Sequence, residues 1–357
     1  MNIREATQSY EAWMRKCSAV IEADLRVKHE QMKEDLFFFF RGTYYRWAQL
    51  FPKICSELSH PPKVLACGDL HVGSFGTWRD AEGRLCWGVD DFDEAYPLAY
   101  TNDLVRLACS VKIVTDCQQL TIKLKRGCEA ILEGYEKALR GGGCPMVLAE
   151  QETYLQKLGI DAIKPSKEFW TKLNRLPGVS GTPPKGLRAI FQKALPPRAD
   201  FKLKRRKAGM GSLGQPRFVA IADWEGGCIA REAKELVPSS SMWVAGRTGR
   251  GQVYYQHAMS GAVRSRDPFQ QIMGGWLIRR LSPDSNPIEI VDLPRNRDEE
   301  TLLHAMGSEA ANVHLGSKRS VGSIWKDLRK KKPNWLRSAA KQMAKAMEQE
   351  WKKYKKA

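Results

Sequence analysis

Residues 64–76 read VLACGDLHVGSFG, and this stretch decides the fold that we expect. Its apolar start, Val64–Cys67, follows two prolines and predicts a short buried strand that leads into the loop at Asp69. A second apolar run, residues 85–89 (LCWGV), follows a turn at residues 80–83 and leads into DDFD at residues 90–93. Two acidic loops are therefore expected at the ends of two neighbouring strands.

The side chains in these two loops suit phosphoryl transfer. That reaction needs a carboxylate that positions the acceptor hydroxyl, and separate oxygen ligands for magnesium. Asp69 and His71 lie in the first loop, and Asp91 and Asp93 lie in the second. Aspartates after strands are also ordinary turn formers. Two acidic loops, each behind an apolar strand, favour a functional site over a pair of turns.

A glycine-rich segment, GMGSLG at residues 209–214, is the second candidate site. In a dinucleotide-binding fold such spacing joins a strand to a helix, but here Pro216 and the alternating residues 217–221 (RFVAI) predict a strand. The pattern favours a hairpin tip of the protein-kinase kind, whose backbone amides approach nucleotide phosphates. The residues expected at the nucleotide are Gly209, Gly211, Ser212 and Gly214.

A lysine completes this second site. Residues 201–236 are predicted as a three-stranded antiparallel meander, with Lys234 on the third strand after a Gly-Gly turn. A cation in that place would neutralise phosphates beneath the hairpin. An ordinary turn with a surface lysine is the alternative interpretation.

The remaining sequence is predicted as mostly helical, and we divide the chain into four parts. Residues 1–143 carry the two acidic loops and end at a Gly-Gly-Gly run, and residues 144–200 are expected to be a linker or insertion. Residues 201–295 form the β-rich nucleotide-binding part, and residues 296–357 are helical with a basic tail. The fold class expected is α+β.

Composition narrows the location and the partners. The net charge of +18, from 58 Lys and Arg against 40 Asp and Glu, indicates an anionic ligand, which could be nucleotide, nucleic acid, acidic protein or lipid headgroup. No apolar run approaches the roughly 20 residues of a membrane span. The N-terminus lacks the apolar core of a secretory signal, so we expect a cytoplasmic protein. The 9 cysteines show no metal-binding spacing.

The basic tail carries an apolar stripe at helical spacing. Its members are Trp335, Ala339, Met343, Met347 and Trp351. Such a helix can dock on its own protein, which we favour, or on an acidic protein, an anionic membrane or nucleic acid.

Four segments resemble, in their residues and in their order along the chain, one bacterial family. It is the domain of unknown function 2252 (DUF2252), a member of the protein-kinase-like superfamily. They are FFFFRGTYY (37–45), CGDLHVGSFG (67–76), VDDFDEA (89–95) and NDLVRLACS (102–110). The blocks AGMGSLG, REAKEL and the region of His314 are similar to later parts of that family. The resemblance implies ATP or another nucleoside triphosphate, magnesium, and a bilobal kinase-like fold that is circularly permuted, because the acidic loops precede the glycine loop.

The resemblance also implies roles for individual residues. Asp69 would be the catalytic aspartate, and His71 would brace its loop by hydrogen bonding. Asp91 would ligate magnesium, with Asp93 as a second carboxylate nearby. Asp103 would fasten the loop.

Further roles are more open. Arg106 is expected to pair with a carboxylate. Arg41 is either a phosphate or carboxylate clamp at the site or a buried structural ion pair. The phosphoacceptor, a small molecule or a protein, is not identified.

Two departures from the kinase-like pattern bear on activity. Ser74 stands where relatives usually carry an asparagine as second metal ligand, and a hydroxyl binds magnesium more weakly. The glutamate that pairs the lysine in kinases is not evident, and Glu235 and Gln256 are weak candidates.

Rival functions follow from these departures and from the charge. The first is a nucleotide-binding regulator with little or no catalysis. A two-metal phosphoesterase also uses Asp-x-His, but needs histidine clusters that this chain lacks. An anion-binding module working through the +18 charge is the third.

Overall fold

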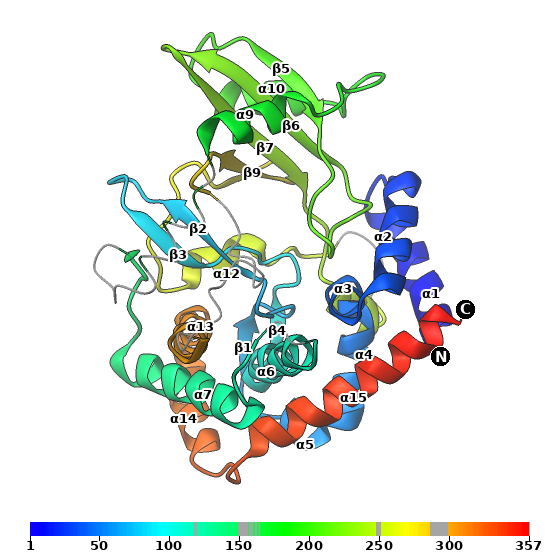
Figure 1. Cartoon of the computed structure of the whole chain (residues 1–357), viewed down its shortest axis with the longest axis vertical. Helices are drawn as coiled ribbons and strands as arrows, with labels where there is room; N and C mark the ends of the chain where they lie inside the picture. Colours follow the sequence, from blue (N-terminus) through cyan, green and yellow to red (C-terminus); the bar gives the residue numbers. More distant parts are fainter. Residues whose placement is uncertain are drawn as a thin grey trace.

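The chain adopts an α+β fold, as the sequence predicts. A computed structural model describes residues 1–117, 120–148, 156, 160, 163, 165–247, 251–285 and 299–356. A five-stranded sheet lies at one end of the molecule, and most of the helices gather at the other end (Figure 1). The two termini lie close together beside the N-terminal helices (Figure 1).

The large sheet has the strand order β5-β6-β7-β9-β8, with every neighbouring pair antiparallel. Its strands are β5 (Phe201–Arg205), β6 (Arg217–Trp224), β7 (Gly227–Glu235), β8 (Gln271–Met273) and β9 (Trp276–Leu281). The predicted three-stranded meander is confirmed as β5, β6 and β7. Strands β8 and β9 extend it at the β7 edge.

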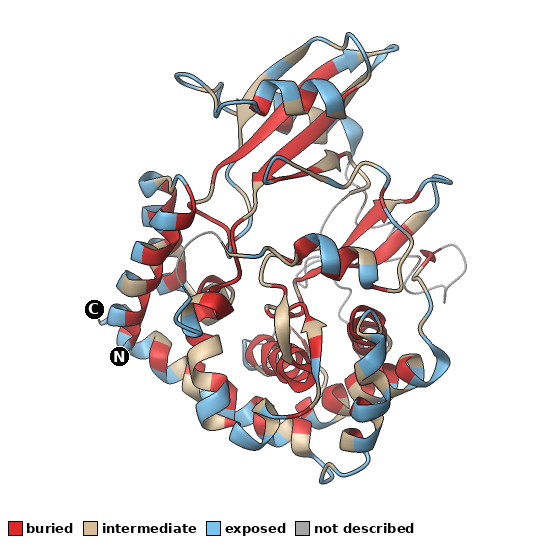
Figure 2. Cartoon of the chain, turned by 180° about the vertical axis from the view of Figure 1, so that it is seen from behind, coloured by how far each residue is buried: buried red, intermediate tan, exposed pale blue. Residues whose placement is uncertain are grey.

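A helix packs on each face of this sheet. Phe191 of α10 (Leu187–Ala194) packs with Phe218 and Ile278, whereas Leu173 of α9 (Ser166–Asn174) packs with Val219 of the opposite face. The central strands β6 and β7 are accordingly buried along most of their length (Figure 2). The segment interpreted as a linker or insertion therefore supplies the helices that cover the sheet.

The helical part is built around three long helices. They are α6 (Tyr100–Asp116), α7 (Leu124–Gly141) and α13 (Glu299–His314). The first part of the chain, which we expected to end at the Gly-Gly-Gly run, ends there with helix α7. Helix α6 is buried over most of its surface, because α7, α13, α15 and the N-terminal helices surround it.

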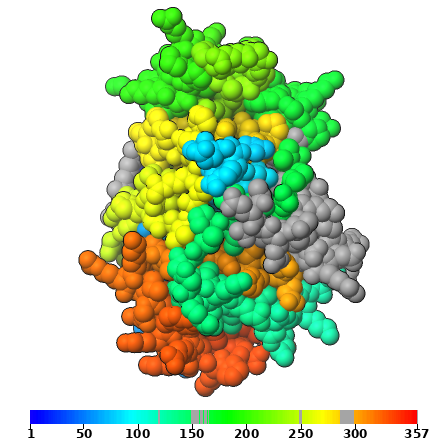
Figure 3. Space-filling model, turned by 90° about the vertical axis from the view of Figure 1, so that its left-hand side faces the viewer, coloured from blue at the N-terminus to red at the C-terminus, as the bar shows by residue number. Residues whose placement is uncertain are grey.

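Two short antiparallel pairs lie between the large sheet and the helices. Strand β1 (Lys63–Ala66) pairs with β4 (Tyr96–Ala99), and β2 (Phe75–Arg79) pairs with β3 (Leu85–Val89). The strands at 64–67 and 85–89 are confirmed, whereas β2 and β4 were not predicted. On the face shown in Figure 3, the β2–β3 hairpin and the yellow segment near residues 251–285 lie between the large sheet and the helices.

The N-terminal helices and the short helices complete the fold. The first group comprises α1 (Ile3–Cys17), α2 (Glu22–Glu34), α3 (Leu36–Gly42), α4 (Tyr44–Ile54) and α5 (Ser56–Ser59). The short helices are α11 (Ser240–Val244), α12 (Tyr255–Gly261) and α14 (Val321–Leu328).

The apolar stripe of the basic tail is covered by the chain itself. The tail forms α15 (Trp335–Lys355), in which Met343 and Met347 are fully buried. The Trp351 indole N–H donates to the carbonyl of Met32 at 3.0 Å, and Arg46 donates to Glu350 at 2.6 Å. The stripe therefore docks on the chain's own helices, as we favoured. Among the described residues no helix has the length and apolar character that crossing a membrane requires.

Candidate functional site

One cavity of about 310 Å³ brings together the two acidic loops, the glycine loop and strand β7. The predicted site residues that line it are Arg41, Asp69, His71, Ser74, Asp91, Asp93, Gly209, Gly211, Ser212 and Lys234. The cavity lies between the large sheet and the loops that follow β1 and β3. Of the four glycine-loop residues expected at the nucleotide, Gly214 lies outside the lining, and its carbonyl accepts the N–H of Ile21 at 2.8 Å.

Asp103 holds the first acidic loop onto helix α6. Its two carboxylate oxygens accept the backbone N–H groups of Cys67 at 2.7 Å and Gly68 at 3.0 Å. His314 Nε2 lies 3.0 Å from the same carboxylate. Gly68 has φ +81°, and a Cβ there would lie 2.3 Å from the carbonyl oxygen of Glu94, so the turn requires glycine. The loop geometry thus agrees with the fastening role that the resemblance implies for Asp103.

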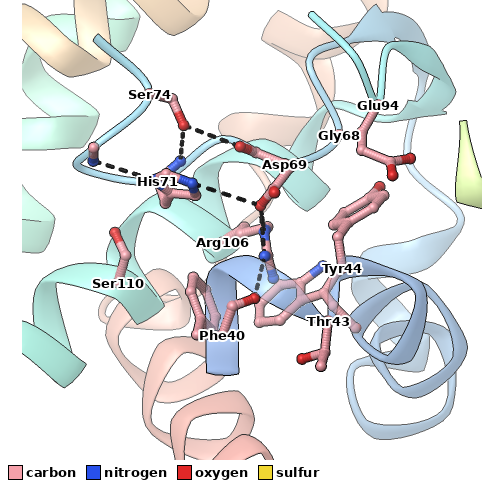
Figure 4. Close-up of polar contacts among 12 residues, drawn as sticks. Phe40, Thr43, Tyr44, Gly68, Asp69, His71, Ser74, Glu94, Arg106 and Ser110 are labelled. Carbon is pink, nitrogen blue, oxygen red and sulfur yellow. Dashed lines mark hydrogen bonds and ion pairs between the residues drawn. The ribbon is translucent and has the colours of Figure 1, made fainter. Parts of the chain in front are cut away.

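Ser74 and His71 shape the loop from within (Figure 4). The Ser74 hydroxyl accepts from the His71 N–H and donates to the carbonyl of Asp69, both at 3.0 Å. The Gly73 N–H donates to His71 Nδ1 at 3.1 Å. Burial and the nearby arginines lower the pKa of His71 well below its usual range, so the ring is neutral. Ser74 is therefore occupied with holding the loop.

Asp69 is held by one arginine from the core. Arg106 is fully buried on α6, and both its Nε and Nη2 reach Asp69 Oδ1 at 2.5 Å. The guanidinium also lies over the Phe40 ring, 3.9 Å from its centroid, and donates to the Phe40 carbonyl (Figure 4). Burial raises the pKa of Asp69, and Arg106 opposes that rise. One oxygen of Asp69 is thus fixed, which fits the expectation that Arg106 pairs with a carboxylate.

The second acidic loop meets Lys234 across the cavity. Lys234 Nζ lies 3.6 Å from Asp91 and forms an ion pair with Asp93. Burial and the neighbouring Asp91 raise the pKa of Asp93 to about 6. Burial alone would also raise the pKa of Asp91. The charge of Lys234 and the hydrogen bond from the Asp93 N–H have the larger effect, so the pKa of Asp91 is lowered. Neither Glu235, which accepts from Ser18, nor the exposed Gln256 lies at Lys234.

Asp91 and Asp93 are the candidate metal ligands at this side of the cavity. Asp93 Oδ1 is buried without a hydrogen-bond partner, so this carboxylate oxygen has lost its water without gaining a donor. Within the described ranges no group of three or more His, Cys, Asp or Glu could hold a metal by itself. Magnesium is commonly bound by one or two carboxylates together with substrate phosphates and water. The donor set suits a metal that arrives with a phosphorylated ligand.

The glycine loop joins two antiparallel strands, as predicted. It connects β5 to β6, and β6 pairs with β7 so that Arg217 lies opposite Lys234. Lys28 of α2, itself buried, donates to the carbonyl of Gly211 at 2.9 Å. A Cβ on Gly211 would lie 3.9 Å from Asp69 Oδ2. The loop therefore reaches across the cavity to the first acidic loop.

Arg41 also points toward the first acidic loop. Its guanidinium carbon lies 5.6 Å from the centroid of the Phe37 ring, and a Cβ on Gly73 would lie 3.8 Å from it. Its Nε is buried without a hydrogen-bond partner. Arg41 thus lies at the cavity with a donor to spare, which favours a clamp over a structural ion pair.

The cavity is more basic than the motifs alone predict. Eight Lys and Arg line it against six Asp and Glu: Lys28, Arg41, Arg206, Arg217, Lys234, Arg264, Arg279 and Arg280, facing Asp69, Asp90, Asp91, Asp93, Glu94 and Asp267. Burial raises the pKa of Asp90 to about 6 and that of Glu94 to about 7. Sequence reasoning missed Lys28, the four arginines on or beside the sheet and Arg264, because only the fold brings them together.

Part of the chain matches a known family. Residues 15–162 match the model of DUF2252, a family described as an uncharacterized protein conserved in bacteria. This part is similar to that family, as its four segments predicted, and it includes both acidic loops but neither the glycine loop nor Lys234. No curated protein and no solved structure matches the chain.

Proposed function

We propose that this protein is a phosphotransferase that uses ATP or another nucleoside triphosphate with magnesium, on a circularly permuted, bilobal protein-kinase-like fold. The contact of Lys234 with Asp91 and Asp93 carries the proposal. Those residues come from segments far apart in the chain, and they meet at the cavity that Asp69 also lines. A phosphate-binding amine, two metal-binding carboxylates and an acceptor-positioning carboxylate in one cleft are the parts that phosphoryl transfer requires.

The nucleotide is placed by the charges on opposite sides of the cleft. Lys234 and the amides of the glycine loop would hold the phosphates from the sheet side. Asp91 and Asp93 would hold magnesium from the other side, and the bound metal would neutralise and orient the phosphates. The pair between Lys234 and Asp93 would then open to admit the phosphate oxygens.

Asp69 would position the acceptor hydroxyl. Arg106 engages one carboxylate oxygen and favours the ionised form, so the other oxygen is available to accept a hydrogen bond from the acceptor. A loose, metaphosphate-like transition state needs orientation more than a strong base. The acceptor remains an unidentified hydroxyl of a small molecule or a protein.

Magnesium-dependent nucleotide binding tests this proposal. We expect ATP with magnesium to bind the purified protein, and Lys234→Ala to weaken binding at least tenfold, as measured by calorimetry. Lys202→Ala, which removes an exposed lysine from the same sheet, is the matched control and should bind like the parent protein. Absence of binding, or equal affinities for all three proteins, would overturn the proposal.

Ser74 supports a second candidate, a nucleotide-binding regulator with weak or no catalysis. Its hydroxyl is engaged by His71 and Asp69 within the loop, so it has little capacity left for a metal. Such a protein would be stabilised thermally by nucleotide without transferring phosphate to any acceptor, to water or to itself. Phosphoryl transfer that appears only in Ser74→Asn would favour this candidate, and transfer by the parent protein would exclude it.

A further inference from the structure

A buried carboxylate on strand β7 gathers three arginines beside Lys234. Glu232 lies two residues before Lys234, so both side chains point to the same face of the sheet. It is 0% exposed and accepts from Arg206 at 2.5 Å, Arg217 at 3.3 Å and Arg279 at 2.7 Å. Three guanidinium groups from three different segments thus converge on one carboxylate.

The cluster keeps an excess of positive charge. Burial would raise the pKa of Glu232, but the arginines hold it well below its usual range, so Glu232 is ionised. Arginine stays protonated in proteins, so three positive charges contact the one negative charge of Glu232. Asp90 also attracts Arg279, and Asp93 attracts Arg217, from the second acidic loop. One arginine would satisfy a single carboxylate, and extra buried charges cost desolvation energy. Glu232 accepts from one nitrogen each of Arg206 and Arg279, so the other donors of these two guanidinium groups suit a further anion.

The arginines are placed to reach a ligand under the glycine loop. Arg206 and Arg217 flank the loop on either side, and Arg217 donates to the Ser212 hydroxyl within it at 2.8 Å. All three arginines line the same cavity as Lys234. Arg217 is buried, whereas the side chains of Arg206 and Arg279 are 28% and 27% exposed, line the cavity, and use one nitrogen each on Glu232.

We propose that Arg206 and Arg279 bind the phosphate chain of the cleft's ligand. Arg217 is a positioning residue that joins Glu232 to the glycine loop, and Glu232 orients the three guanidinium groups by accepting hydrogen bonds from each. The planar fork of arginine matches two phosphate oxygens at once, which a lysine amine cannot do. The identification of that chain as part of a nucleotide rests on the proposed function, but the polyphosphate site itself does not.

Binding of inorganic tripolyphosphate without metal tests the site. Calorimetry at fixed ionic strength, with chelator present, should show binding to the parent protein and at least tenfold weaker binding to Arg206→Gln and to Arg279→Gln. Arg188→Gln removes the same charge from the exposed side of α10, away from the cavity, and should bind like the parent. No binding by the parent, or equal weakening in all three variants, would overturn the proposal.

A folding defect is separable from a binding defect. Arg206→Gln leaves Arg217 and Arg279 on Glu232, so this variant should unfold at nearly the temperature of the parent. Arg206→Lys keeps the charge but loses the fork, and we expect intermediate affinity. Parental affinity for tripolyphosphate in folded Arg206→Gln and Arg279→Gln would refute the site.

The inference and the proposed function fail in different ways. If tripolyphosphate binds through these arginines but magnesium nucleotide neither binds nor reacts, the proposed polyphosphate site is supported and the proposed phosphotransferase activity is refuted. If magnesium nucleotide binds and reacts equally in Arg206→Gln, Arg279→Gln and the parent, the proposed phosphotransferase activity is supported and the proposed arginine site is refuted.

Discussion

At the scale of single residues, Asp103 determines the shape of the loop that carries Asp69. The resemblance to DUF2252 pointed to this aspartate, but not to its contact with His314, which comes from the other end of the chain. The backbone N–H groups of Cys67 and Gly68 are buried and have the two oxygens of Asp103 as acceptors. A buried N–H without an acceptor destabilises a protein by roughly 1–3 kcal/mol.

Replacing Asp103 by asparagine should therefore destabilise the protein by about 2 kcal/mol. Asparagine offers one acceptor oxygen in place of two, so one of the two amides would face an NH₂ group. Urea unfolding followed by circular dichroism measures the change. Asp223→Asn, at an exposed position on β6, is the control and should change stability by less than about 0.5 kcal/mol. Equal stabilities of the two variants would contradict the role of Asp103.

At the scale of elements, helices α7 and α13 pack with their backbones in close contact. Gly134 of α7 and Gly307 of α13 let the two backbones approach: a Cβ on Gly134 would lie 1.9 Å from the carbonyl oxygen of His304. The corresponding Cβ on Gly307 would lie 2.0 Å from the carbonyl oxygen of Ile131. Because backbone atoms cannot rotate away, the helices would have to separate to admit a methyl group.

Gly134→Ala is expected to destabilise the protein by about 3 kcal/mol or more, since overpacking a fixed backbone contact costs at least as much as crowding a flexible core. Gly141→Ala, at the end of the same helix with nothing within 4 Å, should be neutral or slightly stabilising. Thermal unfolding of both variants distinguishes them. A Gly134→Ala protein as stable as Gly141→Ala would contradict this close contact.

The elements show what the sequence could and could not predict. Alternation in residues 217–221 and the Gly-Gly turn before Lys234 were enough for the β5–β6–β7 meander, because these signals are local. Strands β8 and β9 join the same sheet after the long segment between Glu235 and Gln271. No local sequence pattern specifies the pairing of β9 with β7. The segment of helices α9 and α10 is interpreted from sequence as a linker or insertion. Its apolar residues, such as Phe191, are explained only by their packing on the sheet, which the sequence does not show.

At the scale of the whole molecule, the candidate site was predictable only in part. The motifs and the resemblance supplied Asp69, Asp91 and Lys234, and the fold shows that they share one cavity. The arginines around Glu232 lie in three strands or strand ends, so only the sheet register brings them together. Asp91 and Asp93 also hold Lys234 directly, a contact that spacing along the chain does not reveal.

Buried carboxylates should make the metal-free protein more stable at pH 6.5 than at pH 8. Burial raises the pKa values of Glu94 and Glu309 to about 7. Because a carboxyl group has a lower pKa in the unfolded chain, the folded state binds these protons more tightly and loses stability as pH rises through 7. The neutral His71 acts in the opposite direction, but mainly below its ordinary value of roughly 6.5.

Urea unfolding at the two pH values should show a gain of about 1 kcal/mol or more at pH 6.5. Glu309→Gln removes one of the titrating groups and should reduce that gain by roughly half, whatever its effect on absolute stability. Lower stability at pH 6.5 than at pH 8, or an unchanged gain in the variant, would contradict the assignment.

The affinity of Asp91→Asn for nucleotide, measured with and without magnesium, is the most direct test of the central claim. The claim is that Lys234 and a cation held by Asp91 grip the same triphosphate. With magnesium, the variant should bind ATP at least tenfold more weakly than the parent, because a metal ligand is lost. Without magnesium, it should bind as well or better, because a negative charge near Lys234 and the phosphates is removed while Lys234 is kept. Equal effects under both conditions, or no effect under either, would contradict the claim.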